Sequence, residues 1–258
     1  MMTLSNKFTA YSTIAMKEVR RTLRLWIQTL LPPLITTILY FIIFGHVIGS
    51  RIGMMAGVPY LVFIAPGLII MPMIINSFAS GSTVVYSAKM MHQIEELLVS
   101  PMSEFVMLSG YMTGAIFRGL IVGAVVTAAT LFFVHFTVDN IALVILTAVL
   151  SCAFFALFGI LNGVLANSFD DISIIPNFVL SPLIYLGGVF YSVSVLPPFW
   201  QKISLFNPLF YIVDCFRYAF LHINHVAVLP GLLALLVMVI VLFLFIWHLL
   251  KIGYRLRY

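Results

Sequence analysis

The sequence predicts an all-α, polytopic membrane protein with six transmembrane helices. Of its 258 residues, 63% are hydrophobic and only 8% are charged, and the mean hydropathy is +1.16. A membrane-spanning helix needs about 20 mostly apolar residues, so the chain has room for about six spans and no separate soluble domain. Most basic residues lie near the ends of apolar stretches, so the net charge of +5 indicates membrane topology rather than nucleic-acid binding.

Residues 5–27 predict an amphipathic helix that lies on the membrane surface. At about 100° per residue, the apolar side chains gather on one side: Phe8, Tyr11, Ala15, Val19, Leu23 and Trp26. The basic side chains gather on the opposite side: Lys17, Arg20, Arg21 and Arg24. This pattern is typical of an interfacial helix at an anionic leaflet. A helix that packs on a protein partner is the alternative, and both can hold at once.

The first two spans are expected at residues 28–48 and 60–86. Pro32 and Pro33 are expected to open the first span, because a proline at a helix start loses no hydrogen bond. Pro66 and Pro72 in the second, long span predict a kinked helix supported by its neighbours.

The segment at 89–101 (KMMHQIEELLVSP) is too polar to lie in lipid and short enough for one or two helical turns. It has an apolar edge beside two glutamates: Met91, Ile94, Glu95, Glu96, Leu97 and Leu98. Such an edge suits docking onto another protein. A solvated connecting loop is the alternative.

The third and fourth spans are expected at residues 105–134 and 141–165. Both carry glycine pairs four residues apart, a spacing that permits close helix approach. The third span also contains Arg118, and an intramembrane arginine is by default a functional-site hypothesis. Two structural alternatives are contact with a lipid headgroup and a bond to a neighbouring helix.

An acidic turn at 167–171 (NSFDD) precedes the fifth span at 172–193. Asp or Ser just before an apolar helix caps its free N–H groups. The 196–221 segment is rich in aromatics and prolines, and it predicts two short helices, split at Asn207-Pro208, that re-enter the outer interface. The i, i+3 spacing of Asp214 and Arg217 allows an ion pair there. The last span is expected at 229–250.

The distribution of basic residues predicts the orientation. With both termini in the cytoplasm, nine of the 13 Lys and Arg residues lie inside, three lie outside and Arg118 lies in the membrane. This orientation places 89–101 and the acidic turn in the cytoplasm, and the aromatic hairpin outside.

Several kinds of chemistry have no signature here. The sequence lacks a GxxxxGK[ST] phosphate loop, so we expect the chain not to be an ATPase itself. Cys152 and Cys215 are far apart and the histidines are scattered, so we expect no metal site. No span carries the acidic and histidine relay of a proton-coupled carrier. Energy for uphill transport would therefore enter through a cytoplasmic surface.

Four stretches together resemble the permease subunits of ABC-2-type export transporters, over nearly the whole length. They are TLLPPLITTILYFIIFG at 29–45, IEELLVSP at 94–101, NSFDDISIIPNFVLSPLIYLGGVFYSVSVLPPFW at 167–200 and NPLFYIVDCFRYAFL at 207–221. The resemblance implies one ABC-2 transmembrane domain in a bacterial inner membrane. It implies two permeases that work with two copies of a separate ATP-binding subunit, which would bind the ATP and Mg²⁺.

The resemblance also implies roles for the segments above. The N-terminal helix becomes a connecting helix at the cytoplasmic leaflet, and 89–101 becomes the coupling helix that docks on the ATP-binding subunit. Asp170 and Asp171 form a second, smaller contact. The outer lid of the export path would comprise Pro197, Pro198, Phe199, Trp200, Asn207, Pro208, Tyr211, Asp214 and Arg217.

The family exports drugs, lipids, lipid-linked sugars and polysaccharides, and we expect a hydrophobic or amphipathic substrate. The alternatives are polysaccharide or glycoconjugate export, a passive channel or carrier, and an enzyme acting on lipid. Candidate pore-lining residues are the polar or aromatic ones on apolar helices: Phe63, Asn76, Tyr86, Asn162 and Tyr185. For each of them a helix–helix contact is the alternative.

Overall fold

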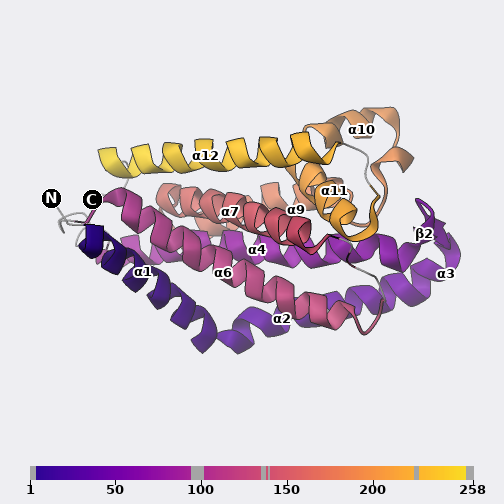
Figure 1. Ribbon diagram of the computed structural model, residues 1–258, viewed down its shortest axis with the longest axis horizontal. Coiled ribbons are helices and arrows are strands. Elements are labelled where there is room, and N and C mark those ends of the chain that lie inside the picture. The colour runs from indigo at the N-terminus through magenta and orange to yellow at the C-terminus, as the bar shows by residue number, and fades with distance from the viewer. Residues whose placement is uncertain (1–3, 94–101, 135–137, 139, 224–226, 254–258) are drawn as a thin grey trace.

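The computed structural model describes residues 4–93, 102–134, 138, 140–223 and 227–253. Within these residues, six helical segments are long and apolar enough to span a membrane: Trp26–Gly45, Tyr60–Met90, Glu104–Thr130, Ile141–Leu165, Phe169–Leu186 and Val228–Ile252. The predicted fold class is confirmed. The long helices share one general direction, and both ends of the chain lie at the same end of the bundle (Figure 1). We call this the terminal end.

Helix α4 (Tyr60–Met90) is the centre of the bundle. It packs on α6 (Glu104–Thr130), α7 (Ile141–Leu165) and α11 (Pro208–Leu221). Small residues set the α4–α7 distance, since a Cβ atom at Gly159 would overlap the carbonyl oxygen of Phe78. The close approach expected from the glycine pairs is therefore confirmed.

The N-terminal part consists of two helices joined by an elbow. Helix α1 (Leu4–Arg24) ends before Leu25, and α2 (Trp26–Ile42) continues in a new direction (Figure 1). Trp26 therefore opens the first span, and the expectation that it belongs to the N-terminal interfacial helix was wrong. Pro32 and Pro33 lie inside α2, so the prediction that they open the span was wrong. The hydroxyl of Thr36 donates to the carbonyl of Pro32.

A short segment that the sequence did not predict connects α2 to α4. After a π-helical turn (Ile43–Ile48) and α3 (Gly49–Ile52), strands β1 (Met54–Met55) and β2 (Val58–Pro59) pair antiparallel. Gly53 and Gly57 have positive φ angles of 71° and 85°. These conformations suit glycine and let the chain reverse within a few residues.

The fifth span is one helical rod in three pieces. Helix α8 (Phe169–Ile175) leads into a π-helical turn (Pro176–Leu180) and then α9 (Ser181–Leu186). The predicted cap is confirmed, since Ser168 and Asp171 form a reciprocal capping box at the start of α8. The rod ends at Gly187, several residues earlier than the expected 193, because Gly188 takes a φ of 72° in a turn.

The chain then forms a 3-10 turn (Val193–Val195), α10 (Pro198–Leu205), α11 and the last span α12 (Val228–Ile252). Asn207 separates α10 from α11, as expected. Its Nδ2 donates to the carbonyl of Leu183 at 2.6 Å, and its Oδ1 accepts from the Leu209 N–H at 2.9 Å. The position of these helices relative to a membrane stays a prediction.

Candidate functional site

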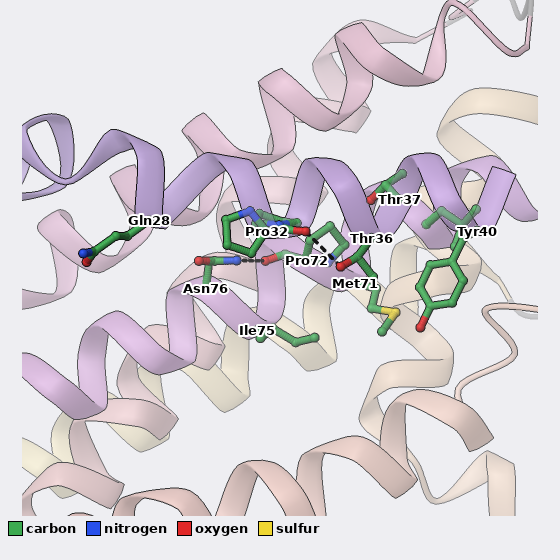
Figure 2. A pocket seen from close by; sticks show the side chains of 11 residues that line it. Gln28, Pro32, Thr36, Thr37, Tyr40, Met71, Pro72, Ile75 and Asn76 are labelled. Carbon is green, nitrogen blue, oxygen red and sulfur yellow. Dashed lines mark hydrogen bonds between the residues drawn. The ribbon is translucent and has the colours of Figure 1, made fainter. Parts of the chain in front are cut away.

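A cavity of about 250 Å³ lies between α2 and α4 (Figure 2). Its lining residues come from these two helices alone: Gln28, Pro32, Pro33, Thr36, Thr37, Tyr40, Leu68, Met71, Pro72, Ile75 and Asn76. Gln28 and Tyr40 lie at opposite ends, as Figure 2 shows. The twelve helical steps from Gln28 to Tyr40 correspond to about 18 Å. The cavity is therefore elongated along the first span.

The walls of this cavity are largely apolar, with a few polar groups along them. The amide Nδ2 of Asn76 donates to the carbonyl of Pro72 at 3.0 Å, and the hydroxyl of Thr36 donates to the carbonyl of Pro32 at 2.9 Å. Both bonds stay within one helix, so the polar groups are held in place without closing the space. Such a site suits a guest with an apolar body and a polar group.

Of the five candidate pore-lining residues, Asn76 lines this cavity. Phe63 is fully buried, and the Arg217 guanidinium lies 4.0 Å from its ring centre. Tyr86 is buried with its ring 4.8 Å from that of Phe169. Asn162 is also buried, and its Nδ2 donates to Ser82 Oγ at 3.0 Å and to the carbonyl of Ile172 at 3.1 Å.

Tyr185, the fifth candidate, is exposed on α9. Sequence analysis missed the α2 side of the cavity, although a signal was present. Gln28, Pro32, Thr36 and Tyr40 follow one another at intervals of four residues, which places them in one row on a helix.

Met91, Asp170 and Asp171 are the residues predicted for docking that the structure describes. Asp170 is exposed at the start of α8, whereas Asp171 serves the capping box, where its Oδ2 accepts from the N–H groups of Asn167 and Ser168. Met91 is exposed at the end of α4. Ile94, Glu95, Glu96, Leu97 and Leu98 lie outside the described residues.

Lys89 connects these two parts of the surface. It is buried at the end of α4, and its Nζ donates to the carbonyl of Ala166 at 2.9 Å and to that of Val164 at 3.5 Å. Both carbonyls belong to the end of α7, where an α-helix leaves such groups without intrahelical partners. The end of α4 is therefore fastened to the residues just before the acidic turn.

At the opposite end of the bundle, Arg217 of the expected outer lid makes two hydrogen bonds to distant parts of the chain. It is fully buried, and it donates from Nη2 to the carbonyl of Gly188 at 2.6 Å and from Nε to that of Phe63 at 3.3 Å. Asp214, with which the i, i+3 spacing allows an ion pair, is buried on the same helix. The other lid residues divide by exposure. Pro197, Pro198, Phe199 and Trp200 are exposed, whereas Asn207 is buried, Pro208 and Tyr211 are half-buried, and Tyr211 Oη donates to the carbonyl of Leu205.

Helix α1 packs on α6 through a side that sequence analysis misjudged. Lys17, Arg20 and Arg24 are exposed as expected, but the buried side comprises Ile14, Ala15, Glu18 and Thr22. Glu18 is only 3% exposed and forms an ion pair with Arg21, with 2.9 Å between Oε2 and Nη2. The sequence did contain a signal for this side of the helix. Glu18 follows Ala15 by three residues and precedes Thr22 by four, so the three side chains lie on one helix face.

A family model described as "ABC-2 type transporter" matches residues 9–221, most of the chain. The chain belongs to the ABC-2 type transporter family. It is therefore a membrane permease subunit of an ABC transporter. The match includes α2 and α4 with their cavity, and Lys89 with the acidic turn.

Named relatives agree with this family. The chain is 50% identical over 248 residues to "Inner membrane transport permease YadH" of Escherichia coli strain K12, which covers 96% of this chain and 97% of the relative. The same figures hold for the protein of that name in Shigella flexneri. "Nodulation protein J" of Rhizobium leguminosarum bv. viciae is 28% identical over 199 residues, 74% of each chain.

Proposed function

We propose that this ABC-2 permease exports a hydrophobic or amphipathic molecule, such as a drug, a lipid or a lipid-linked molecule, across a bacterial inner membrane. The elongated cavity between α2 and α4 carries the proposal, because its apolar walls and sparse polar groups suit such a guest. The inner-membrane location rests on the name of the E. coli and Shigella relatives.

The energy comes from ATP, bound with Mg²⁺ and hydrolysed by a separate ATP-binding subunit. Two such subunits and two permeases form the working unit, with all termini of the permeases in the cytoplasm. The docking surface consists of 89–101 with Asp170 and Asp171. Lys89 supports this assignment, since it joins the end of α4 to the turn that carries both aspartates. A movement at 89–101 would thereby reach α7 and α8 together.

The docking claim is tested with the permease co-expressed and purified with its ATP-binding subunit. Glu95→Lys combined with Glu96→Lys should abolish co-purification, or leave hydrolysis that no longer responds to the permease, because both charges at the contact reverse. Lys202→Glu, an exposed charge reversal on α10, is the matched control. A double variant that assembles and hydrolyses ATP like the parent would disprove this docking surface.

The cavity is tested by transport in proteoliposomes that contain the assembled complex. Thr36→Leu fills the cavity and should lower transport of a fluorescent amphipathic probe about tenfold, while assembly is retained. Thr127→Leu is the control, since Thr127 makes the same bond to the carbonyl four residues earlier, on α6 outside the cavity. Equal transport by the two variants would show that the cavity is not part of the transport path.

A further inference from the structure

The elbow between α1 and α2 lies where apolar side chains meet a group of cations. Leu23, Leu25, Trp26 and Ile27 are all exposed there, and Trp26 is 57% exposed at the first residue of the span. Tryptophan at a span end is typical of the membrane–water boundary. The elbow therefore marks the level of lipid headgroups on this protein.

The register between α1 and α6 places Arg118 near this elbow. Ile14 of α1 faces Gly110 and Glu18 faces Gly114, since a Cβ atom at either glycine would meet that side chain. The two helices advance together by four residues, so the same register places Arg118 opposite Thr22, one turn before the elbow. Arg118 is also near enough to Arg21 for the two charges to repel each other.

The charges at this contact do not balance within the described part of the chain. Arg21 forms its ion pair with Glu18, whereas Arg118 donates no hydrogen bond to any described residue, and its Nε is buried without a partner. Burial of a guanidinium N–H without an acceptor costs about 1–3 kcal/mol. The carboxylate of Glu18 pairs with Arg21, so an acceptor from outside the chain would remove the cost at Arg118.

A basic hollow of about 770 Å³ adjoins the pair. Lys17, Arg20, Arg21 and Arg24 line it together with Ser12 and Thr13. Arg21 lines this hollow and is also the residue whose charge acts on Arg118. Guanidinium groups match the oxygens of a phosphate through paired hydrogen bonds, and two of them from different helices define one position.

We propose that the elbow binds the phosphate of a membrane phospholipid between Arg21 and Arg118. The phosphate neutralises the excess positive charge, and the acyl chains lie along the exposed apolar side chains at the start of α2. Those side chains favour a lipid over a free anion. The bound lipid joins α1 to α6, so the permease requires phospholipid for the full stability of α1. This role is independent of the molecule that the proposed exporter carries.

The test uses the delipidated, purified permease in an uncharged detergent and native mass spectrometry. Phosphatidylglycerol should bind, and diacylglycerol with the same acyl chains should not. Arg118→Gln should weaken phosphatidylglycerol binding about tenfold, since a hydrogen bond to a charged group is worth about 1.5–3 kcal/mol. Lys7→Gln removes one exposed charge from α1 far from the elbow, and it should change binding less than twofold.

Three results would overturn the proposal. If Arg118→Gln binds phosphatidylglycerol like the parent, Arg118 is not part of the binding site. If Lys7→Gln loses as much binding as Arg118→Gln, the lipid is held only by diffuse electrostatic attraction. Competition by millimolar inorganic phosphate, with no preference for the lipid, shows a site for a soluble anion. Arg118→Lys keeps the charge but loses the paired donors, so an intermediate, roughly threefold loss is expected, and this variant decides the matter if Arg118→Gln does not fold.

Discussion

The α4–α7 contact and the α1–α6 contact both depend on glycines, but they differ in the cation that lies beside them. Lys89 is buried, whereas Arg118 is half-buried and only its Nε is known to be shielded from solvent. In each contact, glycines on one helix receive the other helix at close range. Lys89 in the first contact donates to two carbonyls at the end of α7, whereas Arg118 in the second has no acceptor in the described chain. A cation satisfied inside the protein has a structural role, and one with unused donors points to a ligand.

The two contacts also differ in position. Helix α4 is packed against several neighbours, and α1 lies on the outside of the bundle against α6 and the start of α2 (Figure 1). Disruption of the first contact should therefore unfold the bundle, whereas disruption of the second should release one helix. The four predictions below test this difference.

The largest effect is expected from Gly159→Leu in α7. Its side chain would overlap the Phe78 backbone in α4, and overpacking against backbone costs about 3 kcal/mol or more. Thermal unfolding in detergent, followed by size-exclusion chromatography, should show a markedly lower midpoint or no folded protein. Ala142→Leu, at an exposed position of the same helix, should unfold like the parent. A parental midpoint for Gly159→Leu would mean that the contact is looser than described.

Lys89→Met should have the next largest effect. The carbonyls of Val164 and Ala166 lose a buried donor, which costs about 1–3 kcal/mol. The same thermal assay should show a lower midpoint for this variant, and Lys202→Met, which removes an exposed lysine, should not change it. If both variants unfold alike, Lys89 is not the fastening that the structure indicates.

Gly114→Leu should affect α1 more than the bundle. The new side chain would overlap Glu18, but α1 can move outward, so we expect a loss of about 1–2 kcal/mol, smaller than for Gly159→Leu. Trypsin should cleave faster after Arg20 or Arg24, while the thermal midpoint falls only modestly. Ala124→Leu, exposed on α6, should leave the cleavage rate unchanged. Global unfolding would show instead that α1 is integral to the core.

The smallest effect concerns the pH dependence of stability at Glu18. Burial raises the pKa of this carboxyl, and Arg21 and Lys17 lower it by less. Because the folded state then holds the proton more tightly than the unfolded state, Glu18 makes stability decrease as pH rises from about 4 through the raised pKa.

Glu18→Gln removes this contribution, and the other groups cancel in the difference between variant and parent. The free energy of unfolding of the parent, relative to the variant, should therefore decrease between pH 4 and 8. An increase over that range would mean that the Arg21 ion pair outweighs burial.

Features that depend on short stretches could be predicted from the sequence. The span Ile141–Leu165 was predicted at its observed bounds, because a long apolar run between polar residues is unambiguous. The cap at the acidic turn was also predicted, since it depends on residues close together in the sequence, and the structure shows that it is a capping box. The positions of Pro32 and Pro33 in the first span were predicted wrongly. A proline at the start of a helix and a proline inside a helix that is supported by its neighbours have the same local sequence pattern.

The candidate sites were only partly predictable. The docking residues at 94–98 stay a prediction, and Asn76 was named without its partners across the cavity. Gln28, Thr36 and Tyr40 form one row on α2, but the pattern does not show whether a row meets lipid, protein or space. The role of Glu18 was missed because helical periodicity indicates a polar residue on a face, and not the neighbour that it contacts.

The sequence by itself determined that this chain crosses a membrane six times, where most spans begin and end, and which family it resembles. These properties follow from hydropathy, capping and motifs, which are local along the chain. Only the tertiary structure decided that α2 and α4 line a cavity, that Lys89 has acceptors and that Arg118 has none among the described residues. Each of these features depends on which faces of two helices pack against each other. In a membrane protein nearly every helix face is equally apolar, so hydropathy cannot distinguish the packed faces from the others.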